Sequence, residues 1–149
     1  MSVSDLSELR RILSLYAQRL DDRNIDGIVA LFTPDAQVEN PSGVRKGEAQ
    51  IREWLADRFA RQPIGRLELH QTINPVLTVN DDGETALGRT DMLCFRSSET
   101  APWELEVVTR HHDRFAKVRG EWYFREKAIE VRGGFQRAAL GVPNTVSID

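Results

Sequence analysis

The stretch LYAQRLDDRNIDGIVALFTPDA, residues 15–36, decides how the fold begins. Its first part continues a pattern of apolar residues, three and four positions apart, that starts near Ser4 and predicts an amphipathic helix. The polar run at 21–24 ends that helix, and a second short helix is expected over about 25–32. It stops before Pro34, because the residue preceding a proline disfavours helical geometry.

Outward from this stretch, the pattern predicts one more helix and then a series of strands. Helical spacing indicates a third helix over 47–61, and Pro75 separates two of the expected strands. Alternating apolar and polar residues predict strands at 36–40, 67–74, 76–80, 84–96, 104–117 and 121–131. Helices followed by antiparallel strands indicate an α+β fold, and the weakly periodic tail at 133–149 is expected to run over the surface.

Composition indicates one ordinary globular domain spanning 1–149. The chain has 149 residues, 20 Lys+Arg against 23 Asp+Glu, and 40% hydrophobic residues. A net charge of −3 argues against a nucleic-acid partner, and no apolar run approaches the roughly 20 residues that span a membrane. The start of the chain lacks a signal-peptide pattern, so we expect a cytoplasmic protein. Cys94 is the single cysteine, which excludes an internal disulfide.

The order of the elements and three motifs resemble one branch of the nuclear transport factor 2 fold, the SnoaL-like and ketosteroid-isomerase-like proteins. The motifs are the stretch from Leu15 to Ala36, the sequence at 47–51, and Asp113-Arg114-Phe115 followed by Gly120-Glu121-Trp122. The resemblance implies a cone: a curved antiparallel sheet wrapped around three helices, with one deep, mostly apolar pocket. It also implies a homodimer or larger assembly through the outer face of the sheet.

His70 is the first candidate for chemistry. Alternation along the strand places it on one face with Thr72 and Asn74. The resemblance places this strand along the pocket and implies a catalytic histidine, which Asp21 orients from the end of the first helix. Asp22 competes for that role, and a structural pair between the histidine and Asp21 is the alternative.

Tyr16 lies on the apolar stripe of the first helix, and its phenol could donate a hydrogen bond to a substrate oxyanion. The resemblance supports that role, because related isomerases and dehydratases carry a tyrosine at the matching place. A tyrosine on an apolar stripe is also an ordinary core residue.

Several further residues are candidates for substrate binding. Asn40 stands where the resemblance to ketosteroid isomerase implies a general-base aspartate, and an amide cannot take up a proton, so that isomerase chemistry is not expected. Asp91 shares a strand face with Arg89, which resembles the Arg-x-Asp of limonene epoxide hydrolase, but a structural ion pair is the preferred interpretation. The full candidate set for substrate binding is Asn40, Asn74, Asp91, Phe95, His111, Phe115 and Arg125.

The strand residues in this set carry specific expectations. Leu93, Phe95 and Phe115 are expected to leave a cavity for ligand. Arg125 and Lys127 are expected to share a face, where the resemblance to a dehydrochlorinase implies a cation that assists a leaving group. The neighbouring His111 and His112 point to opposite strand faces, so no metal site is predicted.

Together these residues favour a cofactor-free lyase of the dehydratase type. In this interpretation, His70 and Asp21 carry out acid–base elimination on a small hydrophobic, aromatic or polycyclic substrate that contains a carbonyl group. One alternative is an isomerase or cyclase that acts on a polycyclic ketone in the same pocket. The other is a non-catalytic ligand-binding protein, or one similar to the small subunit of a ring-hydroxylating dioxygenase. Neither nucleic acid nor membrane is expected as a partner.

Overall fold

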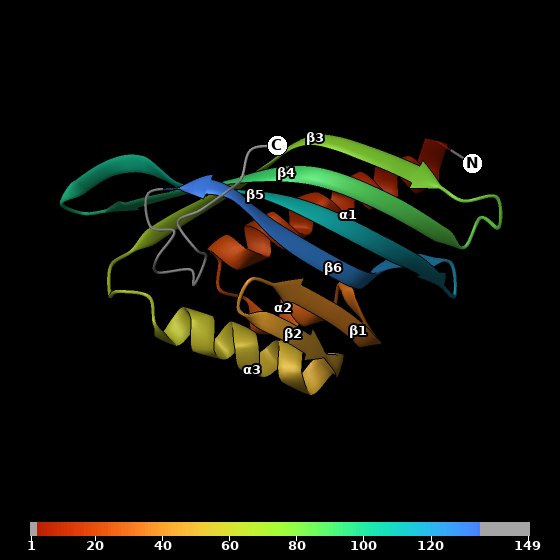
Figure 1. Cartoon of the computed structure of the whole chain (residues 1–149), viewed down its shortest axis with the longest axis horizontal. Coiled ribbons are helices and arrows are strands. Elements are labelled where there is room, and N and C mark those ends of the chain that lie inside the picture. Colours follow the sequence, from red (N-terminus) through yellow and green to blue (C-terminus); the bar gives the residue numbers. More distant parts are fainter. Residues whose placement is uncertain (1–2, 135–149) are drawn as a thin grey trace.

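The computed structural model describes residues 3–134, so most of the tail at 133–149 lies outside the described residues. Three helices and six strands follow one another along the chain (Figure 1). They are α1 (Val3–Asp21), α2 (Ile25–Val29), β1 (Phe32–Asn40), β2 (Gly43–Lys46), α3 (Gly47–Ala60), β3 (Leu67–Val79), β4 (Thr85–Ser98), β5 (Ala101–Val118) and β6 (Glu121–Gly134). Within the described residues, no helix is both long and apolar enough to cross a membrane.

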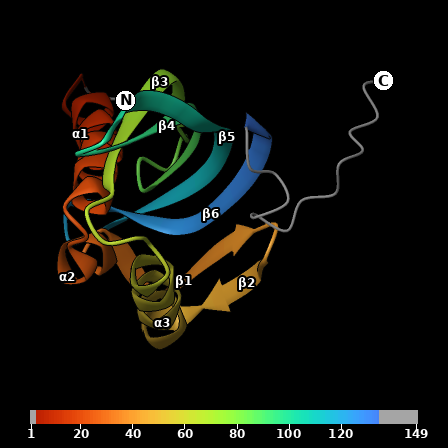
Figure 2. The ribbon, with the colours of Figure 1, turned by 90° about the vertical axis from the view of Figure 1, so that its left-hand side faces the viewer.

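The six strands form one open sheet in the order β2-β1-β6-β5-β4-β3. Neighbouring strands are antiparallel except for β1 and β6, which run parallel. The expected curved, largely antiparallel sheet is therefore confirmed, and the one parallel pair makes it a mixed sheet. Seen end-on, it curves around one side of the molecule while the helices lie on the other (Figure 2).

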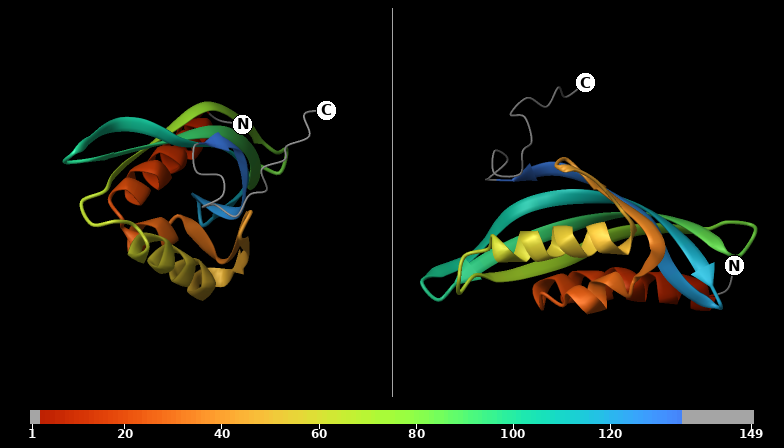
Figure 3. Two further views of the ribbon diagram at one scale, coloured as in Figure 1. Left: turned by 60° about the vertical axis from the view of Figure 1, so that its left-hand side comes forward. Right: turned by 90° about the horizontal axis from the view of Figure 1, so that it is seen from below.

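The helices lie across the concave face of the sheet. From below, α1 and α3 are both seen against this face (Figure 3). The predicted apolar stripe of α1 is confirmed, because all its central members are at most 4% exposed: Leu9, Ile12, Leu13, Tyr16 and Leu20. They pack with three phenylalanines, Phe32, Phe115 and Phe124, whose neighbouring ring centroids are 5.0 and 5.1 Å apart.

The strand β1 begins earlier than the sequence pattern suggests, at Phe32 rather than Ala36. The second helix is correspondingly shorter and ends at Val29. The backbone N–H of Phe124 in β6 donates to the carbonyl of Leu31 at 2.8 Å, so pairing with a distant strand starts here. Local periodicity cannot predict this pairing, because β6 is far away in the sequence. The short strand β2 was not predicted.

Two irregularities in the sheet decide which side chains face the interior. In β3 the register shifts between Ile73 and Val76, and Asn74 has a positive φ of 51°. This bulge accommodates Pro75, which has no N–H to donate, so one continuous strand replaces the two expected. Between β5 and β6, Phe115 pairs with Phe124 and Arg114 pairs with Glu126, which leaves Arg125 of β6 as a bulge.

Candidate active site

The structure brings His70 and Asp21 into direct contact. The Nδ1 atom of His70 lies 2.6 Å from Oδ1 of Asp21, and the backbone N–H of His70 donates to the same oxygen at 2.9 Å. Asp21 is the last residue of α1, and this helix packs along β3. The side chains are only 5% and 16% exposed, so the pair is shielded from water. Asp22 is exposed, which decides between the two candidate carboxylates.

The contact fixes the chemistry of the imidazole. A carboxylate can only accept, so the proton between the two groups is on Nδ1, and in the neutral imidazole the lone pair is then on Nε2. Among the described residues, Nε2 has no hydrogen-bond partner. An imidazole held by a carboxylate at one nitrogen, with the other nitrogen available, is suited to act as a general base.

Tyr16 lies on the same helix as Asp21 but contacts a different group of side chains. Its ring packs edge-on against Phe32, Phe124 and His111, with centroids 5.7 to 6.2 Å apart. The side chain is buried, and burial raises the pKa of the phenol. Tyr16 therefore stays protonated and can serve as a hydrogen-bond donor.

A buried polar cluster adjoins Tyr16, and Lys127 is at its centre. The Nζ atom of Lys127 donates to Asp113 Oδ1 at 2.8 Å and to His111 Nδ1 at 3.2 Å. It also lies 4.5 Å from the ring centroid of Tyr16. The side chains of the ion pair are 1% and 0% exposed, although charged groups are rarely buried so completely. The predicted candidate His111 therefore belongs to an interior network rather than to the His70 pair.

The electrostatics of this cluster follow from its burial. Burial lowers the pKa of His111 well below its usual range, and the Lys127 ammonium lowers it further, so the imidazole is neutral. Burial lowers the pKa of Lys127 and raises that of Asp113, while their attraction opposes both shifts. Because an ammonium only donates, Nδ1 of His111 accepts, and Nε2–H points to the hydroxyl of Thr109 at 3.0 Å.

Arg125 and Lys127 do not share a face. The bulge at Arg125 resets the alternation of β6, so that Lys127 is buried with Phe124 while Arg125 is exposed. One sequence feature had pointed to Lys127: it lies five residues after Trp122, where the resemblance to a dehydrochlorinase implies a cation. Strict alternation, however, placed Lys127 on the same face as Arg125, which is exposed.

Two candidates on β4 lie on the sheet face opposite the cluster. Thr90, Met92 and Cys94 are buried on the inner face, so the alternate residues Asp91 and Phe95 face the other way. Asp91 does form a structural ion pair, but with Arg110 on β5 (2.6 and 3.0 Å) rather than with Arg89. The hydrogen bond from Arg110 holds the pKa of the Asp91 carboxyl below its usual range.

The remaining three candidates for substrate binding lie at a strand bulge, in a turn and in the hydrophobic core. Asn74 is exposed at the β3 bulge, so it does not share the face of His70. The Asn40 side-chain oxygen accepts from Ser42 and Arg45 and thereby organises the turn between β1 and β2. Phe115 is 1% exposed and fills the core, so the expected cavity beside it is not seen there.

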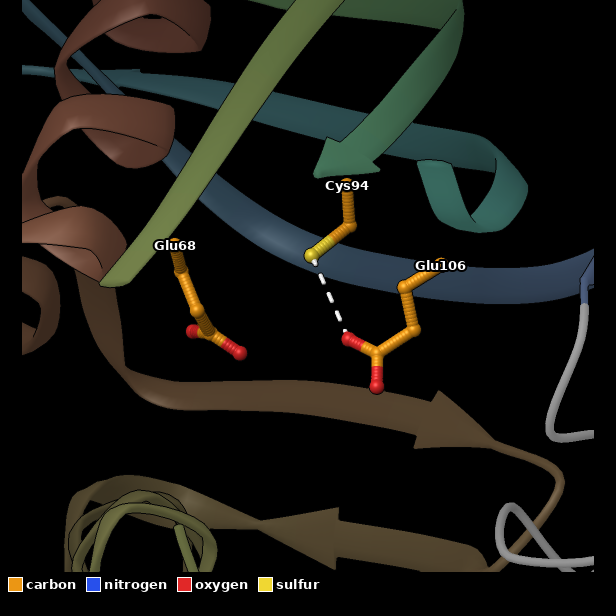
Figure 4. A group of neighbouring side chains, drawn as sticks. All are labelled: Glu68, Cys94 and Glu106. Atoms are coloured by element: carbon orange, nitrogen blue, oxygen red, sulfur yellow. Dashed lines mark hydrogen bonds between the residues drawn. The ribbon is translucent and has the colours of Figure 1, made fainter. Parts of the chain in front are cut away.

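A network of charges next to His70 was missed by the sequence reasoning. Glu68, Cys94 and Glu106 bring potential ligand atoms within 4.8 Å of one another (Figure 4). However, Arg66 bridges both carboxylates, and Arg58 and Arg96 pair with one each. Burial raises the pKa of the Cys94 thiol to about 12, so it stays protonated. Guanidinium groups already neutralise these acids, and the donor set does not favour a metal cation.

Two of the hollows formed by residues 3–134 have volumes of about 300 Å³ each. One lies between α2, α3 and the start of β1, and the other is lined by residues of β1, β4, β5 and β6. Neither is lined by His70 or Asp21. The deep pocket implied by the resemblance therefore stays a prediction.

Known proteins share this architecture. An uncharacterized protein of Mycobacterium tuberculosis is 28% identical over 95 residues, which cover 62% of this chain and 60% of that relative's length. A Nostoc punctiforme protein of unknown function with a cystatin-like fold superposes with a TM-score of 0.80 at 18% identity, covering 91% of this chain and 97% of that one. A hexachlorocyclohexane dehydrochlorinase gives 0.75 at 16% identity, covering 89% and 88%. Identities this low show the shared fold alone.

The family model for the SnoaL-like domain matches residues 1–128, which include both members of the His70 pair and the Lys127 cluster. That match spans most of the chain and agrees with the open curved sheet and its three helices. The chain belongs to the SnoaL-like domain family.

Proposed function

We propose that this protein is a cofactor-free lyase of the dehydratase type, in which His70 and Asp21 form the acid–base pair. The observation that carries the proposal is the 2.6 Å contact between His70 Nδ1 and Asp21 Oδ1, which leaves Nε2 available. The fold is shared with a dehydrochlorinase, an enzyme whose name also denotes an elimination.

The proposed reaction begins with a proton on the carbon next to a substrate carbonyl. Nε2 of His70 takes this proton, and the carbon's electron pair moves into the carbonyl to form an enolate. The enolate then reforms the carbonyl, the bond to a hydroxyl on the next carbon breaks, and the protonated imidazole gives its proton to that hydroxyl. Water and an α,β-unsaturated ketone are the products.

The two other residues have supporting roles in this proposal. Asp21 holds the imidazole in the required tautomer and stabilises its cationic form during the reaction. Tyr16 remains a protonated donor because of its burial, and we propose it as the hydrogen-bond donor to the enolate oxygen. An isomerase would share the first step and return the proton to a different carbon of the enolate system. A cyclase would also share it, but the enolate carbon would then attack a second carbonyl carbon of the same substrate to close a ring, and that carbonyl oxygen would take the proton.

The first experiment isolates proton removal from the later steps. β-Tetralone is incubated with the protein in D₂O, and exchange of its acidic C–H protons is followed by proton NMR. We expect catalysed exchange, lowered by about 10²–10⁴-fold in His70→Ala. Asp21→Asn should also lower the rate, while Asp22→Asn, which changes an exposed neighbour, should leave it unchanged.

A second experiment tests elimination itself. The β-hydroxy derivative of α-tetralone yields fluorescent α-naphthol after loss of water, so product formation is followed directly. Exchange with elimination supports the lyase, and exchange without elimination favours an isomerase or cyclase. Binding of either ketone without exchange would overturn the catalytic role of His70 and favour the ligand-binding alternative.

A further inference from the structure

Two oxygen atoms, one in the Lys127 cluster and one on the neighbouring strand β4, have no hydrogen-bond partner among the described residues. They are Oδ2 of Asp113 and Oγ1 of Thr90, and both are fully buried. Thr90 on β4 lies opposite His111 on β5, and Asp113 is two residues further along β5. The two side chains are therefore diagonal neighbours on the inner face of the sheet. Buried polar atoms nearly always have a hydrogen-bond partner, so two neighbouring unpaired oxygen atoms point to a polar group that binds between them.

The chemistry of these atoms limits what that group is. The attraction of Lys127 favours the ionised form of Asp113, and a carboxylate only accepts, so the incoming group must donate a hydrogen bond. A ketone, ether or carboxylate cannot donate. An ammonium can, but the Lys127 charge within the same cluster repels it. A hydroxyl group fits, because it donates to Asp113 and accepts from the Thr90 hydroxyl.

The cluster lies on the same sheet face as the proposed base. His70 pairs with Cys94 across β3 and β4, and the inner face of β4 continues from Cys94 through Met92 to Thr90. Only Met92 separates the two positions along this strand. A methionine is unbranched and adaptable, so it can change rotamer to admit a ligand between them.

We propose that Thr90, Asp113 and Lys127 form a subsite for a hydroxyl group of the substrate, remote from the carbon on which His70 acts. The inference rests on the proposed function for the identity of the substrate, and it narrows that substrate to carbonyl compounds bearing a second, distant alcohol or phenol.

The test measures binding rather than turnover. β-Naphthol and its methyl ether are titrated by calorimetry into the wild type and into His70→Ala. The two probes share an aromatic body, but only β-naphthol can donate to Asp113. We expect β-naphthol to bind about tenfold more tightly than the ether in both proteins. Because His70→Ala cannot carry out the proposed chemistry, failure of the catalytic proposal does not alter this result.

Matched substitutions locate the preference. Thr90→Val keeps the side-chain shape and removes the hydroxyl that donates to the bound oxygen, so β-naphthol should bind about tenfold more weakly. The double variant Lys127→Met with Asp113→Leu removes the acceptor that only β-naphthol can use, so the preference for β-naphthol should fall to within about twofold. Thr33 is the control, because its Oγ1 is also buried with no hydrogen-bond partner in the described part of the chain, while the residue itself lies at the hollow beside α2 and α3. Thr33→Val should keep the full preference. Thr90→Val should also melt no lower than the wild type, since it removes a buried unpaired polar atom.

A crystal structure with β-naphthol separates a substrate hydroxyl from an internal water. Electron density for the naphthol oxygen between Thr90 and Asp113 supports the subsite. An ordered water that occupies this place in the presence of β-naphthol overturns it. Equal affinity for the two probes, no binding of either, or an equal effect of Thr33→Val also overturns it.

Discussion

Removal of the Lys127 ammonium should destabilise the protein strongly, and the loss should depend on pH. The ammonium and the Asp113 carboxylate are 2.8 Å apart and 1% and 0% exposed. Lys127→Met leaves a buried carboxylate without its counter-ion, which costs about 3–5 kcal/mol in the free energy of unfolding. For a chain of this size, that corresponds to a melting temperature lower by roughly 6–20 °C.

The sign of the pH dependence follows from the pKa of Asp113. Burial already raises that pKa in the folded wild type, and loss of the ammonium raises it further. A carboxyl with a raised folded pKa contributes stability at low pH, and this contribution is lost as pH rises from the unfolded value through the folded one. The deficit of Lys127→Met should therefore be greatest at neutral pH and shrink as pH falls toward about pH 4.

Urea denaturation followed by circular dichroism measures both quantities. The double variant Lys127→Met with Asp113→Leu removes the second charge as well, and we expect its stability to match or exceed that of the wild type. If Lys127→Met were as stable as the wild type at neutral pH, the buried ion pair would not contribute the expected stability. A deficit that does not change with pH would show that lost packing, rather than an unpaired charge, causes it.

Three further substitutions or measurements test other parts of the structure. Gly88→Ala should destabilise the protein by about 1–3 kcal/mol, because the added Cβ would lie 2.8 Å from Phe115. Gly133→Ala in β6 meets no atom of residues 3–134 within 4 Å and should be nearly neutral in thermal melts. Arg66→Met should lower the melting temperature by several degrees, since two largely buried carboxylates lose their shared guanidinium. With a pKa of about 12, the buried Cys94 thiol should react with a disulfide reagent near pH 8 roughly a thousandfold more slowly than in the urea-unfolded chain, and comparable rates would contradict its burial.

Much of the architecture was predictable from local pattern. The apolar stripe of α1 and the bounds of α3 follow from helical periodicity, and the long strands follow from alternation. The motifs that resemble the SnoaL-like proteins placed these elements in one fold, and the family match agrees. Asp21 and His70 were singled out on the same grounds, although 49 residues separate them in the chain.

Alternation failed where the sheet is irregular. A bulge shifts by one residue which side chains face inward. The bulge at Asn74 removes this residue from the face of His70, and the bulge at Arg125 separates it from the buried Lys127. Asp91 and Phe95 were assigned to the wrong face for a simpler reason. A strand with apolar residues on both faces does not indicate which face is inside until it is packed.

Local sequence pattern was enough to predict the three helices and the long strands, because these depend mainly on neighbours within a few residues, but it did not predict β2 or the start of β1. The packed chain was needed to show that Asp21 rather than Asp22 contacts His70, and that Lys127 and Asp113 form a buried ion pair. These contacts depend on where α1 ends on β3 and on a register shift in β6. Both are set by packing between segments far apart in the chain, which no local pattern encodes.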